Sequence, residues 1–193
     1  MSWSIRKSAM RPEAQRKLSE AIERAANAHI PMFASLPDEQ PLPDDAFWPA
    51  RLPSVMAVGA ATPEGTAIHG SGPGSSEAYY FPGVDVLGGY GEHQEIPAGS
   101  SISTALATGL SALLIFCARL LDNDTNRKFN LAELKQMLSS IMKTMPGGVW
   151  FPWVYNVFVL PLAQDRVTED AQARHMIELL METVARRLLA TYH

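Results

Sequence analysis

The fold of this chain is decided by a serine-containing stretch that leads into a long apolar segment: Gly99-Ser100-Ser101-Ile102-Ser103-Thr104-Ala105-Leu106-Ala107-Thr108-Gly109-Leu110-Ser111-Ala112-Leu113-Leu114. The segment continues to Leu121 and is apolar nearly all round, which predicts a helix at the centre of a domain. Serines in the first turn of such a helix lie among backbone N–H groups that have no partner within the helix. Negative charge on a substrate oxygen would be stabilised there. By itself, however, the pattern indicates only a helix cap, for which serine is a preferred residue.

Helix and strand patterns alternate on the N-terminal side of this segment. Residues 12–26 have apolar side chains at spacings of three and four, which predicts an amphipathic helix. Short, nearly uncharged runs predict strands that are buried on both faces, at 30–35, 54–60 and 83–88. Residues 65–82 are rich in Gly and Ser and are predicted to be irregular. The alternation predicts an α/β fold with three layers, in which helices flank a parallel sheet.

Two more helical patterns follow on the C-terminal side. Asn130 and Glu133 have the spacing of a capping box, and the helix that they begin is predicted to reach Met145. Residues 168–189 have charged side chains on one face and these apolar side chains on the other: Met176, Ile177, Leu180, Val184 and Leu188. The aromatic residues within 147–155 are predicted to form a cluster that caps the last two helices.

Composition excludes several classes of function. The 193 residues are 47% hydrophobic and 19% charged, as expected for one globular domain. A net charge of −4 gives no positive field for nucleic acid or an anionic membrane. The apolar segment at 105–118 is too short and too interrupted to predict a membrane span. No metal or cofactor is indicated, because the single Cys117 and the histidine spacing fit no common site. No secretory signal is visible, so a cytoplasmic location is expected.

Several segments, in the same order, resemble the C-terminal half of the subtilisin-like serine proteases. The family signature Gly-Thr-Ser-Met-Ala-Thr-Pro-His-Val-Ala-Gly is similar to residues 99–109, which places Ser101 at the nucleophile position. The family strand Tyr-Pro-Ser-Val-Ile-Ala-Val-Gly-Ala is similar to Leu52-Pro53-Ser54-Val55-Met56-Ala57-Val58-Gly59-Ala60. Residues 30–39 resemble the strand and turn that present the oxyanion-hole Asn, and Asp38 falls at the Asn position.

The resemblance also implies a substrate-binding region. Ser2-Trp3-Ser4 matches a strand end that lines the substrate, and residues 83–88 match the family stretch Asp-Val-x-Ala-Pro-Gly. A peptide or protein substrate is therefore expected to lie along two strand ends, formed by Ser2, Trp3 and Ser4 and by Ala34, Ser35 and Leu36. The resemblance covers about residues 1–150 of a single partial peptidase domain, and 151–193 are predicted to be a helical extension.

The catalytic Asp and His of the family have no counterpart in this chain. In the family both precede the strand that Ser2-Trp3-Ser4 resembles. His69 and His93 are the only histidines in predicted loops, and neither lies on a segment that frames Ser101 in the family. Without a base, Ser101 is a poor nucleophile at neutral pH. An ionised Asp38 would repel the oxyanion that an Asn stabilises, whereas a protonated Asp38 could still donate a hydrogen bond.

Three hypotheses follow for the function. In the first, the chain is a fragment or shortened product of an intracellular subtilisin-like endopeptidase and is inactive alone. In the second, it is a degenerate, non-catalytic domain that binds peptides. In the third, the resemblance is accidental and the chain is an unrelated α/β binding domain. The family resemblance fails if Ser101 lies far from Asp38, or if the strands at 30–35 and 54–60 are not neighbours in a parallel sheet. Loss of the first strands of a parallel sheet also predicts an exposed edge and self-association.

Overall fold

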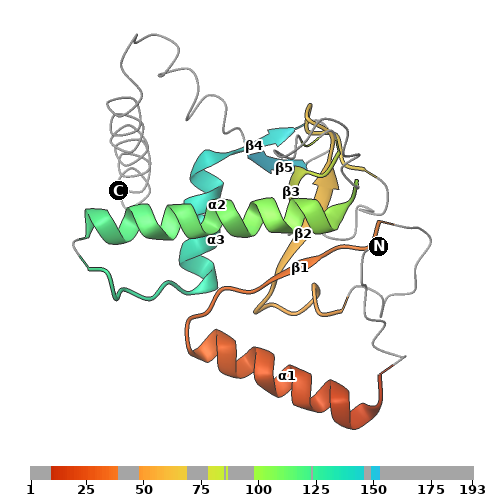
Figure 1. Ribbon diagram of the computed structural model, residues 1–193, viewed down its shortest axis with the longest axis vertical. Coiled ribbons are helices and arrows are strands. Elements are labelled where there is room, and N and C mark those ends of the chain that lie inside the picture. Colours follow the sequence, from red (N-terminus) through yellow and green to blue (C-terminus); the bar gives the residue numbers. More distant parts are fainter. Residues whose placement is uncertain are drawn as a thin grey trace, which may run out of the picture.

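A computed structural model of the chain describes residues 10–38, 48–68, 78–84, 86, 98–122, 124–145 and 149–152. These residues form a sheet with the strand order β1-β2-β3-β5-β4. Strands β1, β2, β3 and β5 are parallel, and β4 is antiparallel to β5. The strands are β1 (Phe33–Ser35), β2 (Met56–Ala61), β3 (Tyr79–Pro82), β4 (Met142–Met145) and β5 (Val149–Pro152), and the helices are α1 (Pro12–Asn27), α2 (Ser100–Leu121) and α3 (Leu131–Ile141). The predicted α/β fold with a parallel sheet and flanking helices is confirmed (Figure 1).

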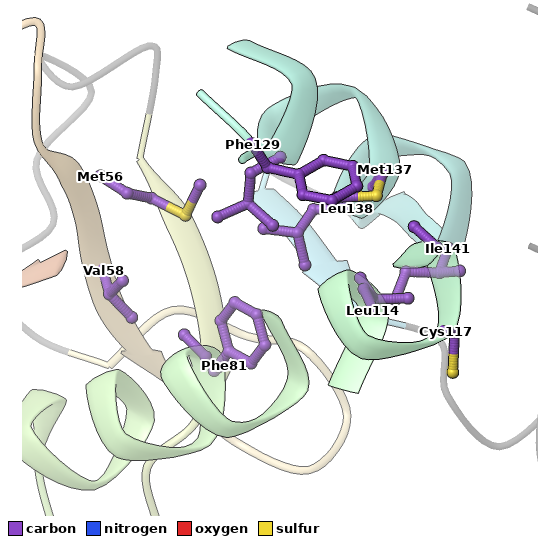
Figure 2. Close-up of a cluster of buried hydrophobic side chains, with 12 residues drawn as sticks. Met56, Val58, Phe81, Leu114, Cys117, Phe129, Met137, Leu138 and Ile141 are labelled. Atoms are coloured by element: carbon purple, nitrogen blue, oxygen red, sulfur yellow. The ribbon is translucent and has the colours of Figure 1, made fainter. Parts of the chain in front are cut away.

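One face of the sheet packs against α2 and α3. Side chains alternate between the two faces of a strand, so Met56 and Val58 of β2 and Phe81 of β3 enter the same layer. There they pack with Leu114 of α2 and Leu138 of α3, and all five are at most 2% exposed (Figure 2). This cluster fixes α2 across the parallel strands (Figure 1).

The opposite face of the sheet has its own apolar layers. Ala61 and Tyr80 point into a cluster with Leu36 and Phe151. Beside it, Ile22 of α1 packs against Trp48 and Val55, which precede β2. The prediction of an amphipathic helix at 12–26 and of strands near 30–35 and 54–60 is therefore confirmed, with β1 shorter than expected. The register pairs Ala34 with Ala57, so these two strands are parallel neighbours.

Two sequence predictions were wrong about element positions, the strand at 83–88 and the end of the helix that begins at Asn130. The third strand is Tyr79–Pro82 within the range predicted to be irregular, and Gly83 and Val84 of the predicted 83–88 strand follow its end. The aromatic side chains of this strand supply the strand propensity that the surrounding Gly and Ser concealed. The helix with the Asn130 capping box is confirmed but ends at Ile141, and the chain to Met145 forms β4. Part of the aromatic stretch at 147–155 is strand β5. The predicted helix at 168–189 lies outside the described residues.

Helix α2 was predicted to be buried on all sides, and this is wrong for one side. Its inner side is buried through Ser103, Ala107 and Leu114, but Leu113 is 42% exposed and Phe116 is 53% exposed. By length and composition alone α2 could cross a membrane. Its packing on the sheet is that of a core helix in a globular domain.

Candidate active site

The chain after β1 meets the first turn of α2. Asp38 lies just beyond the end of β1, and its Oδ1 accepts a hydrogen bond from the Ser100 N–H at 2.8 Å. The Ser100 hydroxyl donates in return to the Leu36 carbonyl at 2.5 Å. The Ser100 N–H is one of the first-turn groups that a helix leaves without an internal partner, so Asp38 caps α2 from a distant part of the sequence. Two segments that are 62 positions apart are thereby joined at one point.

Two glycines allow the close approach at this point. Gly99 has a φ of +146°, and a Cβ there would lie 2.7 Å from Asp38 Oδ2. Gly83 follows β3 and accepts a hydrogen bond at its carbonyl from the Gly99 N–H at 2.8 Å. A Cβ on Gly83 would lie 2.6 Å from Ser103 Oγ. Gly83 has no room for a side chain between β3 and α2, and the positive φ of Gly99 is a conformation that other residues rarely adopt.

Ser103 anchors α2 to the end of β3. Its hydroxyl is fully buried and donates to the carbonyls of Phe81 at 2.9 Å and Pro82 at 3.1 Å. Together with Ser100 it holds the first turn of α2 at the carboxyl ends of two parallel strands, where α/β sheets commonly bind ligands. Sequence reasoning treated Ser100 only as a cap and assigned no role to Ser103. The signal that could have found both is their spacing of three, which puts them on one side of a helix.

Ser101 lies between these two buried serines and is exposed. It is the second residue of α2, so helical geometry leaves its backbone N–H without an acceptor in the helix. The positive end of the helix dipole acts at the same place. A hydroxyl and an N–H donor in this position can meet a carbonyl carbon and the oxygen on which negative charge develops. Asp38 accepts a hydrogen bond from the neighbouring Ser100 N–H, so its carboxylate lies beside this turn.

The structure describes only three of the other predicted substrate-binding residues. Leu36 is 2% exposed, and Ala34 and Ser35 are half-buried on β1. The predicted residues Ser2, Trp3 and Ser4 lie outside the described residues, as do His69 and His93. In the part of the chain that the structure describes, the only histidine is His29, which follows the end of α1. In the same part, no group of three His, Cys, Asp or Glu could hold a metal ion.

Comparison with known proteins identifies solved structures that share this fold. No protein-family model and no curated protein matches the chain. Among solved structures, the prenylagaramide maturation protease PagA is similar, with 24% identity and a TM-score of 0.53 over 68% of this chain and 48% of PagA. The PatG macrocyclase, solved in complex with a peptide, has 25% identity and a TM-score of 0.53 over 68% of this chain and 41% of PatG. The chain thus spans about half or less of the length of these two proteins. It has a subtilisin-like fold and resembles the C-terminal half of the catalytic domain of the subtilisin-like serine proteases.

Proposed function

We propose that this chain is the nucleophile-bearing part of a subtilisin-like serine endopeptidase. Ser101 is the nucleophile, and its backbone N–H binds the oxyanion. The observation that carries the proposal is the contact between Asp38 and the Ser100 N–H, because it joins the two sequence segments that the family uses for the oxyanion hole and the nucleophile. A chance resemblance gives no reason for these two segments to meet, so the contact supports the proposal.

The chain alone is proposed to be inactive toward peptides. Serine attack requires a general base within hydrogen-bond reach of the hydroxyl. The sequence has no segment that matches the Asp or His motif of the family. In subtilisin, loss of the base lowers turnover on the order of a millionfold. A base must therefore be supplied from outside these 193 residues for turnover.

A fluorophosphonate probe tests this proposal. We expect no labelling of the chain in plain buffer and labelling of Ser101 when free imidazole is added as a replacement base. The Ser101→Ala variant should lose this labelling, and Ser139→Ala on α3 should keep it. Mass spectrometry of the labelled peptide identifies the modified serine. Labelling of Ser101 without imidazole would contradict inactivity, and labelling that survives Ser101→Ala would contradict the assignment of the nucleophile.

A non-catalytic peptide-binding domain is the second candidate, and the free edge of β1 favours it. In the described sheet β1 is the first strand and has one neighbour, β2. The Leu36 N–H donates to the Val58 carbonyl, and the Met56 N–H donates to the Met32 carbonyl. Along a strand, alternate residues point their backbone N–H and C=O groups to opposite sides. Met32 and Leu36 bond to β2, so Phe33 and Ser35 point theirs to the open edge. An extended peptide could add there as a further strand.

The variant Ser35→Pro separates strand addition from other modes of peptide binding. Proline removes the N–H that Ser35 offers to the open edge and leaves the bonds to β2 intact. We expect peptide affinity to fall at least tenfold, measured by fluorescence anisotropy with labelled peptides. Ser35→Ala, which keeps the N–H, is the matched control and should bind as the natural sequence does. Equal affinity of the proline and alanine variants would rule out addition at β1.

A further inference from the structure

The outward side of α2 is an apolar surface without a described neighbour. We call it the outer stripe, and its residues recur at helical spacing: Ala105, Leu106, Gly109, Ala112, Leu113 and Phe116. All six are exposed, and the large ones are 39%, 42% and 53% exposed at Leu106, Leu113 and Phe116. The opposite side of the same helix is buried in the core. Contiguous apolar side chains at this spacing are typical of a helix that packs against a second helix.

Gly109 in the middle of the outer stripe gives a second indication. Glycine inside a helix lowers helix stability relative to alanine. A Cβ on Gly109 would meet nothing within 4 Å, so the described fold gives no reason for glycine here. Gly109 lies between Ala105 and Ala112, and small residues in such a row let a neighbouring helix approach closely. The pattern therefore fits a surface that another helix covers.

We propose that the chain covers the outer stripe with its own C-terminal segment, residues 168–189. The apolar positions of that segment, 176 to 188, would extend about 18 Å along a helix, and the outer stripe, 105 to 116, extends about 16 Å. The segment follows β5, which pairs with β3, and β3 contacts α2 directly. The 23 residues 153–175 connect Pro152 to Met176, and an extended chain of that length can span more than about 60 Å, several times the length of the outer stripe.

Tethering favours this segment over a second copy of the chain. A segment on a flexible connection has an effective concentration in the millimolar range, far above that of a separate molecule. If the segment docks by its apolar face, Glu178 and Glu182 remain in water. The outer face of the docked segment is then polar. The inference does not depend on the proposed function, since it concerns the side of α2 away from the sheet.

Thiol labelling in the full chain tests the inference. A reporter thiol is introduced by Leu113→Cys, and a reference thiol on the exposed side of α3 by Ala132→Cys. We expect N-ethylmaleimide to modify the reporter at least tenfold more slowly than the reference. Adding Leu180→Glu with Val184→Glu should remove the protection, whereas the matched polar-face pair Glu178→Gln with Glu182→Gln should leave it unchanged.

One control reports unfolding of the variants, and a second variant blocks docking from the side of α2. Cys117 is 1% exposed, and burial raises the pKa of its thiol, so it stays unlabelled in the folded chain and reports any loss of packing. Gly109→Arg is a second way to block docking, because it places a long charged side chain in the outer stripe, where a Cβ has no neighbour within 4 Å. It should speed labelling of the reporter as much as the charged pair in the segment does.

The inference is overturned if the reporter reacts as fast as the reference in the otherwise natural chain. It is also overturned if protection persists in both the Leu180→Glu, Val184→Glu variant and the Gly109→Arg variant. Protection that disappears on dilution would assign the outer stripe to a second copy instead. Protection that appears only with phosphatidylcholine vesicles would assign it to a membrane surface.

Discussion

Replacing Asp38 with Asn is expected to speed the imidazole-dependent labelling of Ser101 about a hundred- to a thousandfold. A carboxylate only accepts hydrogen bonds and repels the negative charge that develops on the oxygen under attack. An Asn side chain has both functions, because its carbonyl can keep the bond to the Ser100 N–H while its NH₂ group donates to the oxyanion. One such donor contributes about a hundred- to a thousandfold to rate. Second-order rate constants for the fluorophosphonate probe, at fixed pH and imidazole concentration, measure the effect.

Asp38→Ala is the control for this prediction. It removes the repulsive charge but also the acceptor that caps α2, which costs about 1 kcal/mol of stability. It supplies no donor, so we expect little of the gain that Asn gives. If Asp38→Asn folds normally and labels at the natural rate, Asp38 does not lie at the oxyanion position and the proposed site is wrong.

Replacing Phe81 with Ala is expected to lower the free energy of unfolding by about 3–5 kcal/mol. Phe81 is 2% exposed and packs in the cluster that joins β3 to α2 (Figure 2). The loss combines the transfer of a large apolar side chain with the cavity left behind. Since whole domains are stable by about 5–15 kcal/mol, urea denaturation followed by circular dichroism should show a large shift in midpoint.

Ile30→Ala provides the comparison for Phe81→Ala. Ile30 is 56% exposed and lies just before β1, so its truncation should cost no more than about 0.5 kcal/mol. A loss below about 1 kcal/mol for Phe81→Ala, or equal losses for the two variants, would show that β3 and α2 are not packed as described. The same result would remove the support for the site, because Ser103 reaches the Phe81 carbonyl from α2.

Local patterns predicted most of the helices and two of the strands. Hydrophobic spacing was sufficient for α1 and α2, and the reciprocal bonds of Asn130 and Glu133 confirm the capping box that begins α3. Strand β3 was missed because Gly and Ser dominate the residues before it and only the aromatic run at 79–81 favours a strand. The end of α3 was misplaced because Met142–Met145 pairs with β5, a contact that no local pattern records.

The site was predictable in part. Motif resemblance placed Ser101 and Asp38, and the structure brings the segments that hold them together, while their catalytic roles stay predictions. The buried anchors Ser100 and Ser103 were not predicted, because a serine that caps a helix and one that bonds a distant carbonyl look the same in a sequence.

By itself, the sequence determined the class of fold, the parallel pairing of its first strands and the position of Ser101 at the start of α2. These features follow from side-chain periodicity and from short motifs within single segments. Only the tertiary structure decided which strand carbonyls hold that helix, why Gly83 and Gly99 can carry no side chain, and which side of α2 stays uncovered. Those features depend on the approach of segments far apart in the chain, and close packing, unlike periodicity, leaves no regular trace in the order of residues.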